Sequence, residues 1–414
     1  MTALATTAAV SATPLHKNRR FQLVLAGSVI STLGDTFHHL ALSIWVLQVT
    51  GSATAMSAVA TIRILAGILL GAVGGTVADR VDRWRLMWGV DLLRGAIVAM
   101  IAWMIAMPAT PFWAILTLSA LLAVVGQFRG PAFAASLLQI AGQEHVGKAR
   151  SLLQLTSTGA SIVGPLLGGS VVALFGGWAA MTGDSASFFL SALLVVLGGA
   201  FASPRAEAKG KKPPFWADLR SGLVYIKQDP YILGIIILAP SLNFFANVMG
   251  VAFPVLTLNV WKVSPYEFGI IEAAAPVGMA VTGAVMMAVI DRLRRRGLWM
   301  MGATLAFGPI FAALAYAPSV WVATLLVVAM GVGMTITNLI LSVSLQAKVA
   351  PEVQGRVFGT LGSLTNVASP LSVMLAGPLS DQFGPALVIA VTGVLIFVTA
   401  AGLAAGIPAV RKYD

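Results

Sequence analysis

Residues 31–42 read Ser31-Thr-Leu-Gly-Asp35-Thr-Phe-His38-His39-Leu-Ala-Leu42, and they lie in the middle of an apolar segment long enough to cross a bilayer. On an α-helix, Asp35, His38 and His39 share one face, because they are spaced i, i+3 and i+4. A charged side chain at the centre of a spanning helix costs roughly 2.5–3.5 kcal/mol on insertion scales, so it is expected to face a partner or a water-filled cavity. The sequence therefore marks Asp35 as a functional candidate.

The composition excludes an ordinary soluble protein. Of the 414 residues, 58% are hydrophobic and only 10% are charged, and the mean hydropathy is +0.90, as in polytopic membrane proteins. A net charge of +11 would suggest nucleic acid in a soluble protein, but basic cytoplasmic loops explain it better here. The chain has no cysteine, which excludes disulfides and thiolate sites. No cleavable signal peptide is expected, because residues 1–20 lack an apolar core.

Twelve apolar segments are long enough to be spanning helices. They run over residues 21–49, 54–78, 86–107, 111–141, 146–174, 178–202, 230–259, 265–290, 298–316, 319–347, 353–380 and 385–408. Of the 26 Lys and Arg residues, only Lys262 falls on the side opposite the termini, while Arg63, Arg94 and Arg129 lie within helices. The positive-inside rule therefore places both termini in the cytoplasm of a bacterial-type cytoplasmic membrane.

The longest connection divides the helices six and six. The predicted organisation is a cytoplasmic tail over 1–20, a six-helix bundle over 21–202, a linker over 203–229, a second six-helix bundle over 230–408 and a tail over 409–414. The linker is basic and proline-rich and ends in a candidate interfacial helix. It is read either as solvated chain or as a binding segment for anionic lipid headgroups.

The two bundles resemble each other when the chain is shifted by 212 residues. The shift pairs Asp35 with Asn247, Ser52 with Ser264, Gly71 with Gly283, Asp79 with Asp291 and Arg80 with Arg292. Parallel six-helix repeats with a substrate site between them are the plan of one large class of transporters. The predicted fold is thus an all-α polytopic membrane protein of twelve transmembrane helices, built as two parallel repeats.

A charged turn follows the second predicted helix. It reads Gly75-Thr-Val-Ala-Asp79-Arg80-Val-Asp82-Arg83, and Asp91 and Arg94 come one or two turns into the next helix. Ion pairs across such a turn hold two helices in one arrangement and release them in another, which predicts gating. The alternative is that the charges only anchor a short turn. Asp291 and Arg292 occupy the corresponding turn of the second half.

The fifth predicted helix contains Gly164-Pro165-Leu-Leu-Gly168-Gly169. Its proline removes a backbone hydrogen bond, and its glycines let another helix approach closely, so a bend and a tight helix contact are expected. A generic packing motif of membrane helices is the alternative.

Over its whole length the chain resembles the major facilitator superfamily. The turn from Gly75 to Arg83 is similar to the signature G-x-x-x-D-R-x-G-R of that family, and it departs from the signature at Asp82. The D-R-x-D-R form and the stretch from Ser31 to Ala53 are similar to the branch of macrolide efflux pumps and the enterobactin exporter. The resemblance implies alternating access, gating by the charged turn, and a cavity lined by helices 1, 4, 7 and 10. The GPxxGG stretch is similar to a signature of exporting antiporters, which favours export.

Polar side chains on those helices are the cavity candidates. They are Arg129, Asn243, Asn247, Thr335, Asn338, Ser342 and Gln346. The two residues of helix 7 are spaced i, i+4, and the four of helix 10 form one stripe. Because amide side chains in lipid need partners, cavity lining and interhelical hydrogen bonding are equal alternatives for the asparagines. Arg129 does not match the usual arginine pattern of the superfamily on this helix.

The candidates for proton coupling are Asp35, His38, His39, Arg63 and Glu272. Arg63 lies roughly 15 Å into its helix, at a depth similar to that of Asp35, so an ion pair between them is expected. The histidines are read as a proton relay, with His38 favoured by its place on the stripe, or as packing residues. No third ligand completes a metal site beside them. Asp184 is expected to be a structural hydrogen-bond acceptor or cap.

These observations predict a secondary transporter that exports amphipathic or hydrophobic small molecules in exchange for protons. It would need no cofactor beyond the proton gradient, and it would act as a monomer on small-molecule substrates, in contact with membrane lipid but not with nucleic acid. Lysophospholipid or siderophore transport and nutrient symport are the alternatives. An enzyme is not supported, because the sequence has no catalytic triad, metal motif or phosphate loop.

Overall fold

The computed structural model describes residues 14–200, 226, 229–411 and 413, and every regular element in this part of the chain is helical. Most of the predicted linker over 203–229, including its candidate interfacial helix, lies outside the described residues, as does most of the predicted amino-terminal tail. The first half comprises α1 (Arg19–Thr50), α2 (Ala53–Arg80), α3 (Arg83–Ala106), α4 (Phe112–Gly126), α5 (Arg129–Ala141), α6 (Val146–Phe175) and α7 (Gly177–Leu197).

The second half begins at Pro230. It comprises α9 (Pro230–Val255) with a π-helical turn η1 (Leu256–Val260), α10 (Pro265–Val289) with a 3-10 turn η2 (Ile290–Arg292), α11 (Arg296–Ala315), α12 (Val320–Lys348), α13 (Pro351–Phe383), α14 (Pro385–Gly406) and the short α15 (Pro408–Arg411).

The helices have the length and polarity of membrane spans. In the described part of the chain, ten helical segments, with α4 and α5 taken together, are long and apolar enough to cross a bilayer. The remaining two, α1 and α13, have 32 and 33 residues but are more polar, because they carry side chains such as Asp35 and Asp381. Large apolar side chains point outward, including Leu174, 75% exposed, and Met287, 78% exposed. The chain is an all-α polytopic membrane protein.

The predicted fourth span is not one helix. The structure breaks it into α4 and α5 at Gln127 and Phe128. The break has a local cause, because Pro131 has no amide hydrogen for the carbonyl of Gln127, four residues earlier. That carbonyl lies instead against α2, where a Cβ on Gly74 would come within 2.5 Å of its oxygen. Arg129 therefore starts a new helix.

Side-chain caps fix the start of several helices and follow the sequence repeat. Asn18 accepts a hydrogen bond from the Phe21 amide at 3.0 Å at the start of α1. Ser52 caps α2, and its repeat partner Ser264 caps α10. Capping side chains satisfy amide groups that the first turn of a helix leaves without partners. The same position therefore starts the second helix in both halves.

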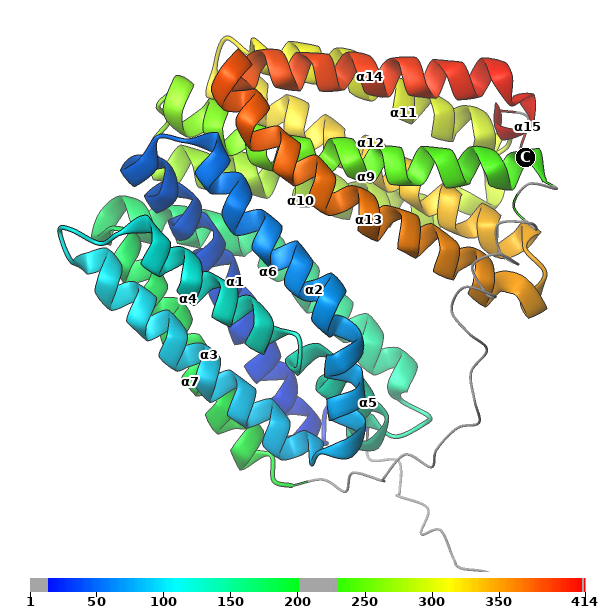
Figure 1. Cartoon of the computed structure of the whole chain (residues 1–414). Coiled ribbons are helices and arrows are strands. Elements are labelled where there is room, and N and C mark those ends of the chain that lie inside the picture. The colour runs from blue at the N-terminus through cyan, green and yellow to red at the C-terminus, as the bar shows by residue number, and fades with distance from the viewer. Residues whose placement is uncertain (1–13, 201–225, 227–228, 412, 414) are drawn as a thin grey trace, which may run out of the picture.

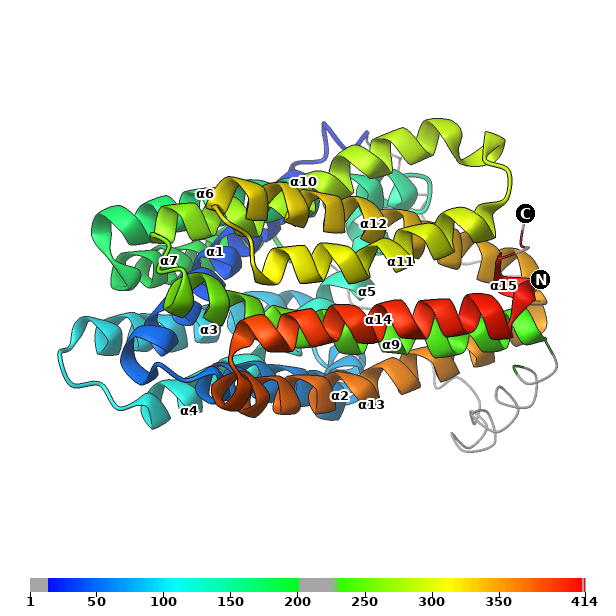
Figure 2. The ribbon, with the colours of Figure 1, turned by 90° about the horizontal axis from the view of Figure 1, so that it is seen from above.

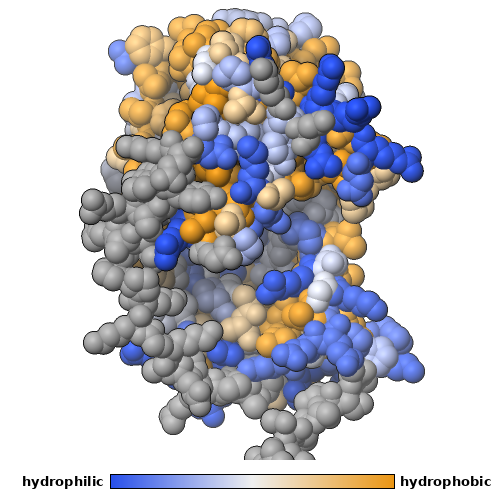
Figure 3. Space-filling model, turned by 90° about the vertical axis from the view of Figure 1, so that its right-hand side faces the viewer, coloured by the Kyte–Doolittle hydropathy of each residue, from blue (hydrophilic) through white to orange (hydrophobic). Residues whose placement is uncertain are grey.

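The two halves form a wedge (Figure 1). Both described chain ends and the residues that flank the linker lie at one end of the molecule, here called the terminal side, and there the halves diverge (Figures 1 and 2). At the opposite end, the closed side, α6 packs against α10 and α2 packs against α13. Hydrophilic side chains gather on the terminal side, over both halves (Figure 3).

Candidate functional site: a cavity between the two halves

A cavity of about 630 Å³ lies between the two halves. Its walls come from α1, α2 and α6 of the first half and from α9, α10, α11, α12 and α14 of the second. Most of its lining is apolar and adaptable, with the side chains of Met249, Phe253, Phe268, Phe307, Phe311, Met330 and Met334. These residues were not predicted as cavity lining, although the i, i+4 pairs Phe307/Phe311 and Met330/Met334 are visible in the sequence.

The predicted set of lining helices is correct for α1, α9 and α12 but wrong for the fourth span. Neither α4 nor α5 contributes to the cavity, and α6 and α10 take part instead. The reason is the interface at the closed side, which brings the middle of α6 and of α10 to the boundary between the halves.

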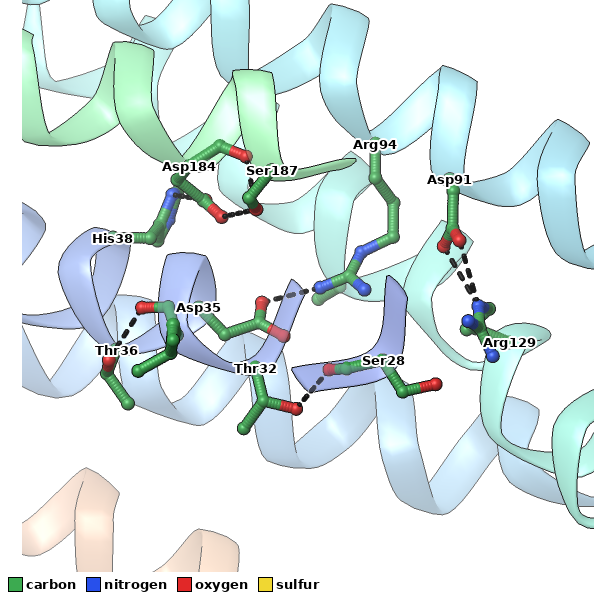
Figure 4. Close-up of polar contacts among 12 residues, drawn as sticks. Ser28, Thr32, Asp35, Thr36, His38, Asp91, Arg94, Arg129, Asp184 and Ser187 are labelled. Carbon is green, nitrogen blue, oxygen red and sulfur yellow. Dashed lines mark hydrogen bonds and ion pairs between the residues drawn. The ribbon is translucent and has the colours of Figure 1, made fainter. Parts of the chain in front are cut away.

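Asp35 and His39 present their side chains to the cavity from successive turns of α1. Thr32 and Thr36 lie on the same wall and donate to the carbonyls of Ser28 and Leu33, at 2.8 and 2.6 Å (Figure 4). The hydroxyl hydrogens are therefore used within their own helix, while the hydroxyl oxygens can still accept. Asp35 and His39 are the titratable groups on this wall.

Asp35 forms an ion pair with Arg94 of α3, not with Arg63. The Arg94 Nη2 atom lies 2.7 Å from Asp35 Oδ1 (Figure 4). The guanidinium lies over the Phe188 ring, 4.0 Å from its centre. The Arg94 side chain is 13% exposed and that of Asp35 is 48% exposed. The expected pair with Arg63 is wrong, because equal depth in two helices does not place two side chains on facing surfaces. Arg63 lines the cavity from α2, and no carboxylate of the described residues lies within ion-pair distance of it.

His38 faces away from the cavity, into the first half. Its Nδ1 atom lies 3.1 Å from Asp184 Oδ2 of α7, and both residues are buried (Figure 4). The two helices touch here, since a Cβ on Gly34 would collide with Ser187 and Asp184. His39, and not His38, thus shares the cavity wall with Asp35, although the helical stripe favoured His38 as the relay partner. The relay itself stays a prediction. Asp184 is a buried hydrogen-bonding residue, as expected.

Asp91 and Arg129 form a second buried pair beside the first. Arg129 Nε lies 3.0 and 3.1 Å from the two oxygens of Asp91, and the Ser191 hydroxyl donates to Asp91 Oδ2 at 2.8 Å. The pair ties the start of α5 to α3 and α7 (Figure 4). Arg129 is therefore not a cavity residue. Asp91 and Arg94 do not belong to the charged turn either, because they lie roughly 12 Å or more beyond it along α3.

Glu272 of α10 is the carboxylate on the wall formed by the second half. No hydrogen bond or ion pair reaches it from the described residues. Carboxylates buried away from water are normally paired. A ligand cation or a proton would meet here a group without competition from a protein partner.

Three prolines add backbone acceptors to the cavity wall. Pro165, Pro254 and Pro276 line the cavity inside α6, α9 and α10. Each lacks the amide hydrogen that would bond the carbonyl four residues earlier. Those carbonyls belong to Ser161, Gly250 and Glu272, which also line the cavity. Three carbonyl oxygens are thus deprived of their usual helical donors around one space.

The other predicted cavity residues divide into two groups. Asn243 and Asn338 line the cavity. The Asn247 amide donates to Ser369 of α13 at 3.2 Å, so it links two helices. On α12, Thr335 donates to the Gly331 carbonyl at 3.0 Å, and Gln346 donates to Ser342 at 3.2 Å. These three residues and Asn247 do not line the cavity.

The charged turn lies on the terminal side. Arg83 forms an ion pair with Asp79 at 3.4 Å and also donates to the carbonyls of Ala78 and Ala135. Asp82 caps α3 by accepting from the Arg85 amide at 3.0 Å. Of the remaining predicted gating residues, Gly75 is half-buried and three are exposed: Arg80, Asp291 and Arg292. The bonds from Arg83 to Asp79, Ala78 and Ala135 and the Asp82 cap all lie within the first half.

The GPxxGG stretch of α6 packs against two helices. A Cβ on Gly164 would collide with Thr36 of α1, and one on Gly168 would lie 3.2 Å from the Phe37 ring. A Cβ on Gly169 would lie 2.6 Å from the Pro265 carbonyl oxygen and 3.1 Å from Gly269 Cα of α10. The stretch therefore provides close contact both within the first half and between the halves.

Comparison with known proteins agrees with this architecture. The family model of the Major Facilitator Superfamily matches residues 24–373 and 241–411. Macrolide efflux protein A of Streptococcus pyogenes is 21% identical over 88% of this chain and 90% of its own length. The multidrug efflux pump Tap of Mycobacterium tuberculosis is 27% identical over 87% of each chain.

The fold is also that of solved transporters. The structure of a bacterial homolog of the human lysosomal transporter Spinster, in an inward-facing and unoccupied conformation, covers 96% of this chain and 99% of its own, with a TM-score of 0.72 and 15% identity. The family match spans nearly the whole chain, and the helical repeat with its central cavity is the architecture that the match requires. The chain is a transporter rather than an enzyme, and it belongs to the Major Facilitator Superfamily.

Proposed function

We propose that this transporter exports amphipathic, cationic small molecules by alternating access, in exchange for protons. The observation that carries the proposal is the pair of carboxylates on opposite walls of one apolar cavity. Asp35 is bound to Arg94, and Glu272 has no partner among the described residues. Two carboxylates allow the proton and the substrate to act at separate groups. The names of the efflux relatives support export.

Asp35 is the proposed proton site. Its carboxylate accepts a charge-assisted hydrogen bond from Arg94 across α1 and α3. A proton on Asp35 removes the negative charge that holds the guanidinium and so frees α1 to move relative to α3. One proton moving across ~100 mV provides about 2.3 kcal/mol, which supports a concentration gradient of roughly fiftyfold.

Glu272 is the proposed binding group for the substrate. Asp35 already has a counter-charge, so a cation gains more by approaching Glu272. The rings of Phe268, one turn earlier on α10, and of the other lining phenylalanines suit both apolar groups and cations. Arg63 is the arginine among the described lining residues, so the cavity wall carries no cluster of arginines and lysines, which disfavours an anionic siderophore.

The terminal side is proposed to face the cytoplasm of a bacterial cell, because basic residues flank the helices there. In this conformation the cavity would load from the cytoplasm or the inner leaflet and release after the closed side opens. We propose that the chain works as a monomer, requires no cofactor beyond the proton gradient, contacts membrane lipid and does not bind nucleic acid.

The test is transport of tetraphenylphosphonium, a lipophilic cation, in proteoliposomes with an imposed pH gradient. Wild type is expected to accumulate the cation against its gradient. Asp35→Asn is expected to retain downhill exchange but lose accumulation, whereas Glu144→Gln, an exposed carboxylate outside the cavity, behaves as wild type. Accumulation by Asp35→Asn contradicts the coupling role, and transport that ignores the pH gradient contradicts antiport. A lysophospholipid in the same vesicles tests the apolar cavity for lipid transport, and the direction of transport tests symport.

A further inference from the structure

Asp381, near the end of α13, caps the start of α2 across the boundary between the halves. Its Oδ1 atom accepts from the Ala53 amide at 2.7 Å. Its Oδ2 atom accepts from the Ser52 hydroxyl at 2.7 Å and from the Thr54 amide at 3.0 Å. These amides belong to the first turn of α2, which its own backbone cannot satisfy. A carboxylate at the positive end of a helix is also favoured by the helix dipole.

The corresponding helix of the second half is capped from within. Ser264, the repeat partner of Ser52, accepts from the Glu267 amide, and Glu267 Oε2 in turn accepts from the Ser264 amide at 2.8 Å. This is a complete capping box. In the first half the position that corresponds to Glu267 is Ala55. The carboxylate that α10 takes from its own third residue is therefore supplied to α2 by the other half.

The contact around Asp381 is closely packed. A Cβ on Gly377, one turn before Asp381, would lie 2.7 Å from Thr54 Cα and 2.8 Å from the Ala53 carbonyl oxygen, and it would collide with Ser57. On the same side, the Asn259 amide donates to the Gly51 carbonyl at 3.2 Å. Asp381 thus lies in a closely packed interface between α13 and α2.

We propose that Asp381 is a conformational latch, which favours the state in which the closed side is shut. The Ser52 hydroxyl also accepts from the Thr54 and Ala55 amides, at 3.1 and 3.3 Å, so this part of the cap stays within the first half. Opening the closed side still takes the carboxylate away from the Ala53 and Thr54 amides and from the Ser52 hydroxyl. The first half has no carboxylate of its own to replace it, because position 55 is alanine. The inference rests on the proposed exchange between two open states but not on the substrate or the coupling ion.

The absence of cysteine makes the latch directly measurable. Spin labels on Met107→Cys and Tyr316→Cys would report the opening of the closed side, since both residues are exposed, at 45% and 67%, in turns of that side on different halves. Asp381→Ala in the labelled full-length chain should raise the ratio of open to shut about fivefold, the effect expected for the loss of one cap. Glu267→Ala is the matched control, because it removes a cap within one half and should not shift the ratio.

Ala55→Glu tests the latch by adding a carboxylate to the first turn of α2. It completes a capping box in α2, competes with Asp381 for the Ser52 hydroxyl, and should shift the ratio toward open while α2 stays capped. Asp381→Ala added to Ala55→Glu should then shift it little further. An unchanged ratio in both single variants, or an equal shift in Glu267→Ala, overturns the latch. If the distance between the two spin labels in wild type is the same under all conditions, alternating access itself is contradicted.

Discussion

The Arg94 guanidinium holds the Asp35 carboxylate at 2.7 Å, and it reaches α1 from α3 past the ring of Phe188. The pair stands at the cavity wall, with its arginine mostly buried and its carboxylate half exposed. Its two members are therefore not equivalent. Removal of the arginine leaves the Asp35 carboxylate without its counter-charge. Asp35→Asn instead leaves an amide oxygen that can still accept the hydrogen bond from Arg94.

The first prediction follows from this asymmetry. Arg94→Met is expected to lower the free energy of unfolding by about 1–3 kcal/mol, and Asp35→Asn by less. The double variant should recover part of the loss, with a coupling of about 0.5–3 kcal/mol in the double-mutant cycle. Thermal unfolding of the four purified proteins in detergent measures this. Additive effects would mean that the two groups do not interact.

The second prediction separates the neighbouring histidines. His38→Ala removes the partner of Asp184, which is fully buried, and should lower the free energy of unfolding by about 3–5 kcal/mol, as expected for a buried pair that loses one member. His39→Ala removes a side chain exposed in the cavity and should change stability by only about 0.5 kcal/mol, while it alters transport. Each variant is the control for the other. Equal melting temperatures would contradict the assignment of His38 to the packing of α1 on α7.

The third prediction concerns charge selection in the cavity. Glu272→Gln should weaken binding of tetraphenylphosphonium at least about tenfold, since a tenfold loss corresponds to ~1.4 kcal/mol of charge interaction. Binding of tetraphenylborate, an anion of the same shape, should not weaken. Fluorescence quenching of the purified protein by the two ions measures both. Equal losses for the two ions would indicate a change of shape and not of charge.

The fourth prediction concerns the contact of α6 with α10. Gly169→Ala places a methyl group 2.6 Å from the Pro265 carbonyl oxygen, so the two helices must separate, and both stability and transport should fall. Gly159→Ala on the same helix is the control, because nothing lies within 4 Å of its Cβ. That control is expected to be neutral or to stabilise the helix by up to about 1 kcal/mol. If Gly169→Ala leaves both stability and transport unchanged, α6 and α10 are not in contact in the functioning transporter.

The sequence predicted the helical repeat well because its signals are local. Apolar length, basic connections and the capping serines act within one helix or one turn. The position of Asp35 beside a cavity was also readable, since a carboxylate in an apolar helix needs a special environment. Glu272 was predicted as a proton carrier, and its place in the cavity wall came from the structure. Pro131 indicates the break between α4 and α5, but residues 111–141 were predicted as one span because of their continuous apolar length.

The partners were not readable, because they depend on how helices rotate against one another. Arg63 and Arg94 are both arginines inside spans, and the packing of α1 and α3 on α7 brings Arg94 to Asp35. The same packing turns His38 toward Asp184 and leaves His39 to the cavity. The contribution of α6 and α10 to the walls likewise follows from the contact between the halves, which no single span encodes.

The prolines in the cavity wall bear on how such a transporter changes its range of substrates. The carbonyls of Ser161, Gly250 and Glu272 owe their lack of a helical donor to the residues that follow them, Pro165, Pro254 and Pro276. Replacement of lining side chains such as Phe307 or Met334 therefore alters the shape of the space while these backbone acceptors stay in place. Mutational drift of the lining can then produce pumps of different selectivity that all retain the capacity to hold a hydrogen-bond donor.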